Sequence, residues 1–188
     1  MSDDPVATRV LSDAGELEFQ HYFVRQRCAP QVQSIRFAGA SQAQAAPGVV
    51  EALCDEQSRA ILIAPSNPFL SIDPILAVPA IRQALMQTRV PVIAVSPVVA
   101  GDAVKGPTAK IMRELGLEVS AGTVARHYGD LIDGMLIDVR DPPTSLDLAH
   151  ARADTLMKTL EDRIRVARAA LDLADAVRSG NLPPVRVP

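Results

Sequence analysis

Two short apolar segments dominate the middle of the chain. Residues 60–64 (Ala-Ile-Leu-Ile-Ala) and 90–95 (Val-Pro-Val-Ile-Ala-Val) carry no polar side chain and are bounded by arginine on one side and by proline or serine on the other. Such runs are typical of parallel strands that are covered on both faces. Residues 74–86 between them have a helical pattern, which we expect Asp73 to cap and Pro79 to kink or restart. Strand, helix and strand in this order predict a βαβ unit.

The residues before this unit predict smaller elements. Residues 8–23 alternate between polar and apolar positions around the turn signal Asp13-Ala14-Gly15, which indicates a β-hairpin. Residues 32–37 alternate in the same way and predict a further strand, and residues 49–56 predict a short helix. We therefore expect residues 1–58 to form a hairpin and a connecting segment ahead of the core.

The residues after the unit complete an α/β pattern. Helices are expected over residues 108–115 and 123–133, each followed by a glycine that ends it, and a third core strand over residues 135–138. Residues 146–177 are predicted to be mostly helical, with an apolar stripe along residues 155–177 that packs on the core or dimerises. The predicted fold class is therefore α/β, a parallel sheet with covering helices.

The composition agrees with one α/β core. The 188 residues are close to the usual size of one domain, and 48% are hydrophobic while 22% are charged. Aromatic residues make up only 3% and tryptophan is absent, so the core must be built from Ala, Val, Ile and Leu, as parallel strands and their helices usually are. We expect residues 59–180 to form the ligand-binding core with its C-terminal helix, and residues 181–188 to form a tail.

Charge and hydropathy argue against several classes of partner. The net charge is −3, which gives no general attraction to nucleic-acid phosphates or anionic lipid. The acidic start of the chain has no apolar signal-peptide region, and no stretch approaches about 18 unbroken apolar residues. We therefore expect a cytoplasmic protein with no nucleic-acid and no membrane partner. Cys28 and Cys54 are expected to be reduced thiols without a role.

The loops that follow the apolar strands are the candidate binding sites, because ligands of parallel sheets bind beyond the carboxyl ends of the strands. After the first strand, Ser66 and Asn67 place a hydroxyl and an amide between Pro65 and Pro68, which restrict the backbone. Such a polar corner suits a phosphate or a base edge, but these two residues are also common helix caps. The residues alone leave ligand contact and capping as open alternatives.

The loop after the second strand carries a lysine. Ser96 leads through an alanine-glycine turn to Lys105, Gly106 and Pro107, and an ammonium group beside glycine suits phosphate oxygens. A solvated surface lysine is the alternative, and the residue order does not match a Walker A loop.

Several aspartates surround the third predicted strand. They are Asp130, Asp133, Asp138 and Asp141. Carboxylates suit a hard cation, yet this spacing fits no EF-hand, so helix ends and turns are the simpler interpretation. The three histidines of the chain have no metal-ligand spacing among themselves.

Taken together, these motifs resemble the 2-phospho-L-lactate transferase family. The resemblance runs over nearly the whole chain, from about residue 8 to residue 176. Each motif is weak alone, and their combination is specific. The segments that carry the resemblance are Phe19-Gln20-x-Tyr22-Phe23-Val24-Arg25, Pro65-Ser66-Asn67-Pro68, Ser71-Ile72-x-Pro74-Ile75-Leu76, Val95-Ser96-Pro97, Lys105-Gly106-Pro107, Tyr128-Gly129-Asp130-x-x-Asp133-Gly134-x-x-Ile137-Asp138 and Asp154-Thr155-x-Met157.

The resemblance implies a transferase of deazaflavin coenzyme F420 biosynthesis with a Rossmann-like fold. Members of the family join a phospho-carboxylic acid, such as phospholactate or phosphoenolpyruvate, to the deazaflavin alcohol Fo. The acid comes from a guanylylated donor, GMP is released, and Mg²⁺ is the cofactor. Positioning and electrostatics would supply most of the catalysis. The substrate- and nucleotide-binding residues that the resemblance implies are Ser66, Asn67, Pro68, Ser71, Ser96, Lys105 and Gly106.

The sequence also departs from the family pattern. Members open with a strand and a glycine-rich loop, followed by aspartates associated with the metal, and this sequence contains neither. We therefore expect a chain truncated at the N-terminus, whose Mg²⁺ ligands are missing and which works with a missing N-terminal half or as a homodimer. A degenerate or non-catalytic nucleotide-binding module of the same fold is the alternative. Ala100-Gly101 stands where the family has two glycines, so a loop that needs glycine would be strained there.

Overall fold

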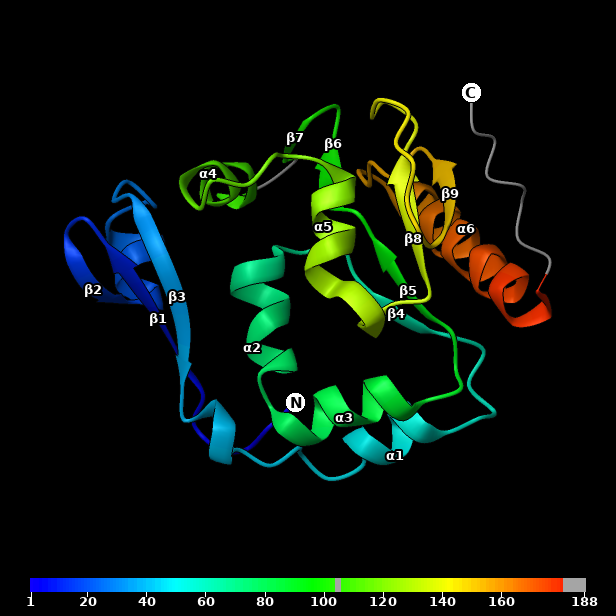
Figure 1. The fold of residues 1–188 in the computed structure, drawn as a ribbon, viewed down its shortest axis with the longest axis horizontal. Coiled ribbons are helices and arrows are strands. Elements are labelled where there is room, and N and C mark those ends of the chain that lie inside the picture. The colour runs from blue at the N-terminus through cyan, green and yellow to red at the C-terminus, as the bar shows by residue number, and fades with distance from the viewer. Residues whose placement is uncertain (104–105, 181–188) are drawn as a thin grey trace.

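A parallel sheet forms the centre of the protein, in a computed structural model that describes residues 1–103 and 106–180. Its four strands lie in the order β4-β5-β8-β9 and are all parallel (Figure 1). They are β4 (Ile61–Ile63), β5 (Val92–Val95), β8 (Gly134–Asp138) and β9 (Ala149–Ala153). The two apolar segments of the sequence are therefore neighbouring parallel strands, as predicted, and the third predicted strand lies beside them.

Helices cover both faces of this sheet (Figure 1), which confirms the predicted layered α/β fold. The covering helices are α6 (Leu160–Ser179) on one face and α3 (Pro79–Gln87) and α5 (Ala121–Tyr128) on the other. Leu173 of α6 packs in one apolar cluster with Ile93 and Leu136. Val92 and Met135 point the other way, into the larger cluster that α3 and α5 share. Alternate residues of each strand thus serve opposite layers.

Strand β4 differs from its prediction, because it is an edge strand of the described sheet and is not covered on both faces. Its neighbour on the inner side is β5, where Leu62 lies opposite Ile93. Leu62 therefore points to the side of α6, but α6 packs on β5, β8 and β9, so that Leu62 remains 42% exposed. Ile63, on the opposite face, is buried. A continuous apolar run predicts the strand correctly and its position in the sheet wrongly.

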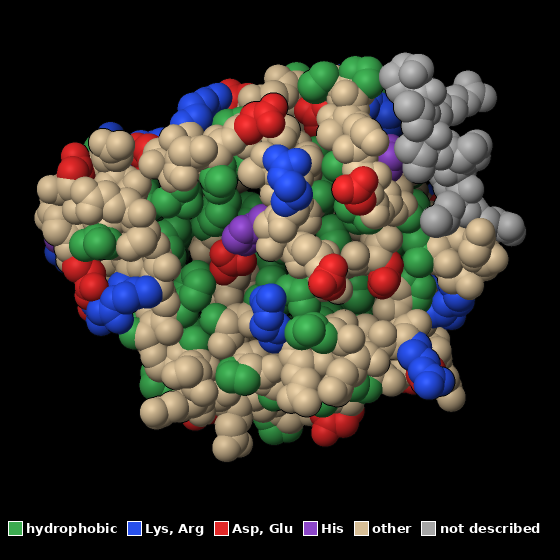
Figure 2. Space-filling model, in the orientation of Figure 1, with side chains coloured by type: hydrophobic (Ala, Val, Ile, Leu, Met, Phe, Trp, Pro, Cys, Tyr) green, Lys and Arg blue, Asp and Glu red, His purple; other side chains and the backbone are tan. Residues whose placement is uncertain are grey.

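The N-terminal part forms a second, antiparallel sheet in the order β2-β1-β3, which confirms the predicted hairpin and strand. Its strands are β1 (Ala7–Ser12), β2 (Gly15–Glu18) and β3 (Val32–Ala38), with the π-turn η1 (His21–Arg25) between the last two. Val10 and Tyr22 belong to the larger apolar cluster of the central sheet. Lys110 Nζ donates to the Pro30 carbonyl at 2.9 Å and adds a polar link. Hydrophobic side chains gather between this sheet and α5 on the face in Figure 2.

The helical segment after β4 begins earlier than predicted. It consists of η3 (Pro68–Ile72) and α2 (Asp73–Leu76), after which α3 starts at Pro79. Pro79 therefore restarts the helix, because its fixed φ suits a first helical turn. Asn67 caps the segment, so the prediction that Asp73 is the cap is wrong. Asp73 lies inside the segment, where its carboxylate bonds to His127.

The region after β8 departs most from the sequence prediction. We expect residues 146–177 to be helical, but residues 149–153 form β9, and α6 begins only at Leu160, behind a capping box of Thr159 and Asp162. Alanine favours helix by intrinsic propensity, yet the alternate alanines of β9 pack beneath α6, and tertiary packing decides. The alternation in Ala-His-Ala-Arg-Ala is the signal that identifies this strand.

The apolar stripe predicted along residues 155–177 is confirmed only in its later part. Leu160 and Ile164 are 65% and 41% exposed, whereas Val166, Ala170 and Leu173 are buried on the sheet. Val166 and Ala170 belong to the predicted stripe, whereas Leu156, its first predicted residue, lies in the loop before α6 and does not share the periodicity of the helix.

The remaining elements lie close to their predictions. α1 (Val49–Cys54) and α4 (Thr108–Glu114) are helices as expected. The helix predicted over residues 123–133 begins earlier, as α5, and continues as the 3₁₀ turn η4 (Gly129–Leu131), so that residues 132–133 are outside it. Short helix η2 (Ala40–Gln42) follows β3, and the loop after β5 forms a hairpin of β6 (Val98–Val99) and β7 (Asp102–Ala103). The predicted tail, residues 181–188, lies outside the described residues.

Within the described residues, no single helix has the length and hydropathy needed to cross a membrane. One pair of helical segments, Pro68–Leu76 and Pro79–Gln87, reaches these criteria only when its two parts, bent by 87°, are counted together.

Candidate functional site

A cavity of about 450 Å³ lies at the carboxyl edge of the central sheet, where ligands of α/β folds bind. One part of its lining is apolar and the other is polar and neutral, and none of the described lining residues carries a charge. The apolar part includes Phe19, Phe23, Leu70, Val99, Leu156 and Met157. The polar part includes Ser66, Asn67, Ser71, Ser96, Thr108 and Thr155.

Three of the four strands lead directly to polar groups of this pocket. Asn67 follows β4, Ser96 follows β5, and Thr155 follows β9, and all three line the cavity. Asp138 ends β8 and is fully buried directly behind Thr155, to which it bonds. The site is therefore built along the whole carboxyl edge, from one outer strand to the other.

Most of the residues predicted from the sequence meet in this pocket. Ser66, Asn67, Ser71, Ser96 and Gly106 line it together. Their convergence is a finding, and their role in binding stays a prediction.

Two of the predicted residues do not enter this set. Pro68 is buried and begins η3. Lys105 lies outside the described residues. Gly106 has a φ of 71°, a left-handed conformation that glycine adopts without strain.

Asn67 caps the helical segment with the oxygen of its amide, so the capping alternative is confirmed. Its Oδ1 accepts the backbone N–H groups of Phe69 and Leu70, both at 3.0 Å. Because the oxygen faces the helix, Nδ2 must face away from it. Nδ2 is buried and has no hydrogen-bond partner among the described residues. An unpaired buried donor costs free energy, so this group is one that a ligand would satisfy.

Ser96 is held by its own loop. Its Oγ accepts the Val98 N–H at 3.2 Å and lies 3.4 Å from the Val98 carbonyl oxygen, and only 1% of the residue is exposed. The hydroxyl thus closes a tight turn at the end of β5. The serine of this motif fixes the backbone that borders the pocket.

Two phenylalanines form an aromatic wall of the pocket, a role that the sequence alone does not predict for them. Phe19 and Phe23 come from the N-terminal part, and their ring centroids lie 5.3 Å apart. Phe23 remains 41% exposed beside the cavity. Exposed aromatic faces suit stacking with a flat ring. Because the two residues are more than 40 positions from Ser66, only the fold brings them to the pocket.

Asp138 organises the wall opposite Asn67. Its carboxylate accepts the backbone N–H and the hydroxyl of Thr155, both at 2.8 Å, and the backbone N–H of Arg140 at 2.8 Å. Arg140 Nη1 also reaches Asp138 Oδ1 at 3.0 Å and Asp154 Oδ1 at 2.9 Å. Burial alone would raise the pKa of Asp138, but these hydrogen bonds outweigh it and lower the pKa. The carboxylate is thus an ionised anchor for the segment after β9.

Asp141 anchors the turn between β6 and β7. Its Oδ1 accepts the Gly101 N–H at 3.3 Å, while Oδ2 is buried without a partner in the described part of the chain. Burial raises the pKa of Asp141. Ala100 in this turn has a φ of 54°, so the alanine does occupy a conformation that glycine takes more easily, as the sequence predicts.

The acidic side chains of the described residues are spread along the chain and take structural roles. Among residues 1–103 and 106–180, no group of three or more histidine, cysteine or acidic side chains is placed to hold a metal. Asp133 Oδ2 accepts the Val92 N–H at 2.8 Å, and Asp138 is surrounded by Thr155 and Arg140. These aspartates hold turns and strand ends, which is the simpler of the two interpretations of the sequence.

Comparison with known proteins identifies the family. A family model described as 2-phospho-L-lactate transferase CofD matches residues 1–175 of the chain. The chain belongs to the 2-phospho-L-lactate transferase CofD family. This confirms the resemblance drawn from the motifs of the loops after β4 and β5.

Curated relatives in the CofD family carry two names. The phosphoenolpyruvate transferase of Streptomyces griseus is 42% identical over 189 residues, which cover 95% of this chain and 59% of the relative. The 2-phospho-L-lactate transferase of Methanosarcina barkeri is 37% identical over 182 residues, which cover 94% of this chain and 58% of the relative. The chain therefore spans less than two thirds of the length of these relatives.

A solved structure supports the fold. A crystal structure of a Bacillus halodurans protein superimposes with a TM-score of 0.60 at 13% identity, over 90% of this chain and 60% of the other. At this identity the likeness concerns the arrangement of strands and helices alone.

Proposed function

We propose that this CofD-family protein functions as a transferase that joins a phospho-carboxylic acid to the deazaflavin alcohol Fo. The observation that carries the proposal is the pocket at the carboxyl edge of the sheet, where the family motifs after β4 and β5 meet. Its aromatic wall and neutral polar groups suit a flat ring with a hydroxylated side chain. Relatives named phosphoenolpyruvate transferase and 2-phospho-L-lactate transferase support the reaction class.

The proposed reaction exchanges one phosphorus–oxygen bond for another. The side-chain hydroxyl of Fo attacks the phosphorus next to the carboxylated fragment of a guanylylated donor. The new P–O bond forms, the bond to GMP breaks, and the proton of the hydroxyl passes to the solvent. The residues of the pocket bind the acceptor and orient its hydroxyl, which converts an encounter in solution into a reaction of held groups.

The remaining expectations accompany this proposal as predictions. They are Mg²⁺ as cofactor, a guanine nucleotide as part of the donor, a cytoplasmic location, and a partner that is either a second copy or the part of the enzyme that this chain does not match. Among the described residues, no group of three or more histidine, cysteine or acidic side chains is placed to hold the ion, and no step is assigned to it.

Product analysis tests the proposal. The purified chain is incubated with Fo, Mg²⁺ and guanylylated phospholactate or guanylylated phosphoenolpyruvate, alone and after co-expression with the region of the Streptomyces griseus relative that this chain does not match. We expect the Fo conjugate by mass spectrometry and an equal amount of GMP by chromatography. If folded protein yields no conjugate in either preparation, the proposal is overturned.

A further inference from the structure

Two polar groups of the pocket have a fixed hydrogen-bonding direction. The first is the Asn67 amide, whose oxygen is used by Phe69 and Leu70 and whose buried Nδ2 has no partner among the described residues. An amide that offers only its nitrogen can only donate. Asn67 lines the cavity, and the only hydrogen-bonding group that its side chain has left to offer is a donor.

The second group is the hydroxyl of Thr155, at the other end of the sheet edge. Thr155 is 5% exposed, and its Oγ lies 2.8 Å from Asp138 Oδ2. An ionised carboxylate can only accept, so the threonine donates its one proton to Asp138 and keeps only lone pairs for a ligand. The backbone N–H of Thr155 and both N–H contacts of Arg140 hold the carboxylate in this position.

The other hydroxyls of the pocket have no fixed hydrogen-bonding direction towards a ligand. A hydroxyl can rotate to donate or to accept, and Ser96 is already engaged with Val98. The two fixed groups are also far apart, because Asn67 follows β4 and Thr155 follows β9, the outer strands of the sheet. Three strand spacings of about 4.8 Å separate these strands, which is roughly 14 Å. A ligand that reaches both groups must be extended.

We propose that the pocket recognises its ligand by hydrogen-bond polarity, with Asn67 donating to an acceptor atom at one end and Thr155 accepting from a ligand hydroxyl at the other. Asp138 is the positioning residue that fixes Thr155 as an acceptor. This inference rests on the proposed function, and it goes beyond it by assigning a hydroxyl of the acceptor's side chain to Thr155. Asp138 and Thr155 thereby gain a role in selecting a hydroxylated substrate.

Fluorescence titration with two deazaflavins tests the Thr155 end. The probes are Fo and the same ring system with a methyl group in place of the hydroxylated side chain. We expect wild type to prefer Fo, and Thr155→Val to reduce this preference by about tenfold, the value of one hydrogen bond to a neutral group. Thr155→Ser restores the hydroxyl and should keep the preference. Asp138→Asn can turn its NH₂ group towards Thr155 and should reduce the preference as Thr155→Val does.

The Asn67 end is tested with Asn67→Asp. Aspartate is an equally good cap, so the helix start is retained, but an acceptor oxygen replaces the donor nitrogen. We expect the affinity for both probes to fall by about tenfold or more, since two acceptors then face each other. Circular dichroism establishes that each variant is folded, and the affinity of Thr155→Val for the methyl analogue should equal that of wild type.

The outcomes separate the two proposals. Wild type that binds neither probe overturns both the acceptor assignment and the polarity. Wild type that binds Fo, with Thr155→Val and Asn67→Asp retaining wild-type affinities for both probes, overturns the polarity alone. If Thr155→Ser loses the preference for Fo as completely as Thr155→Val does, the effect comes from packing and not from the hydroxyl. This result also overturns the polarity proposal.

Discussion

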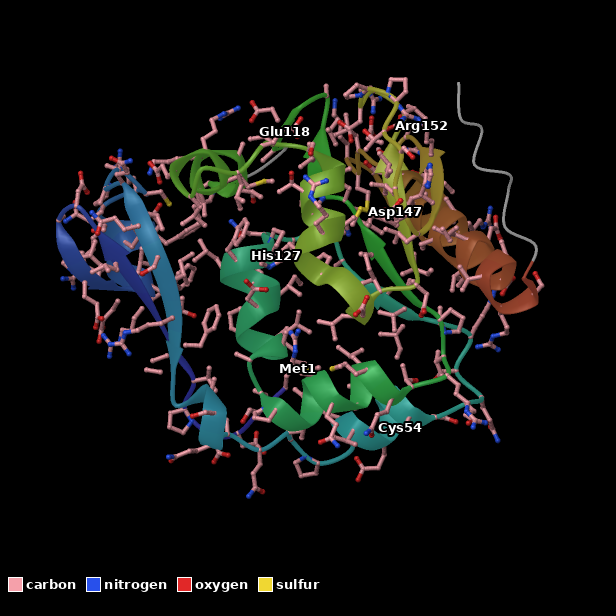
Figure 3. All side chains as sticks on the ribbon, in the orientation of Figure 1. Met1, Cys54, Glu118, His127, Asp147 and Arg152 are labelled. Atoms are coloured by element: carbon pink, nitrogen blue, oxygen red, sulfur yellow. The ribbon has the colours of Figure 1, made fainter. Side chains whose placement is uncertain are left out.

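His127 Nε2 lies 2.8 Å from Asp73 Oδ1 and links the last turn of α5 to the first turn of α2. Figure 3 labels His127 beside these two helices. The two side chains are only 27% and 22% exposed. Removing either side chain leaves the other without its partner in a largely buried position. We expect His127→Ala and Asp73→Ala each to lower the free energy of unfolding by about 1 kcal/mol in urea denaturation.

The double variant and an exposed pair supply the controls. The double variant should lose clearly less than the sum of the single losses, because the shared contact is removed only once. Arg89 and Glu56 lie 3.8 Å apart and are 86% and 69% exposed. Arg89→Ala should change stability by less than about 0.5 kcal/mol. Fully additive losses at His127 and Asp73 would contradict a direct coupling.

In the turn between β6 and β7, we expect substitutions at two neighbouring positions to change stability in opposite directions. Ala100 and Gly101 have φ values of 54° and 73°. Ala100→Gly relieves the left-handed alanine and should raise the free energy of unfolding by about 1 kcal/mol. Gly101→Ala introduces the same strain, although its Cβ would meet no atom within 4 Å, and should lower stability by about as much. Thermal denaturation measures both, and shifts of the same sign would refute the interpretation.

Asp138 predicts a loss of stability in acid. Burial tends to raise its pKa, but hydrogen bonds from Arg140 and Thr155 dominate and lower it below the unfolded value of about 3.9. The stabilisation is therefore complete above that unfolded pKa and is lost as the pH falls through the folded-state pKa. Asp138→Asn should cost about 2 kcal/mol at pH 7 and should flatten the acid limb of a stability profile below about pH 4.

We expect Asp141 to affect the pH dependence of stability in the opposite direction, so it serves as a comparison for Asp138. Burial raises its pKa more than the N–H groups of Gly101 and Ala100 lower it. Because the folded-state pKa lies above the unfolded one, ionisation reduces stability at neutral pH, and this cost disappears as the pH falls through the folded-state pKa. Asp141→Asn should raise the free energy of unfolding at pH 7. A decrease like that of Asp138→Asn would show that its charge is needed.

At Gly134, beneath α6, the packing leaves no room for a larger side chain. A Cβ at this position would lie 2.9 Å from Ile93 Cδ1 and 3.2 Å from the Ala149 carbonyl oxygen. Gly134→Ala should therefore lower the free energy of unfolding by about 1–3 kcal/mol, measured by chemical denaturation. Gly122, inside α5, is the control, since its Cβ would come no closer than 3.3 Å to a methyl group of Thr144. Gly122→Ala should be close to neutral or slightly stabilising, because alanine favours helix.

The sequence predicts the local parts of this fold well. The apolar runs identify β4 and β5, and alternation identifies β1 and β3, because these patterns report which faces are buried. It does not predict that β4 lies at a sheet edge, since Leu62 is apolar in either position. It also does not predict β9, whose alanines have no strong strand preference and depend on α6 for burial.

The sequence likewise predicts some residues of the candidate site and misses others. Ser66, Asn67 and Ser96 are recognisable because each directly follows an apolar strand. Thr155 belongs to the motif Asp154-Thr155-x-Met157, but the sequence does not assign it to the pocket, because its place there requires both β9 and the carboxylate of Asp138, 17 residues earlier. The direction of the Asn67 amide also needs coordinates, since the sequence cannot tell which end of the amide the helix uses.

The walls of the pocket include stretches near residues 19, 66, 96 and 155, which follow strands of both sheets. A site assembled from such distant stretches exists only while the whole chain is folded. Ligand occupancy and global unfolding are then thermodynamically linked, and a ligand at one hundred times its dissociation constant adds about 2.7 kcal/mol to the native state. The melting temperature of this protein is therefore itself a gauge for screening compounds, whatever chemistry the bound molecule undergoes.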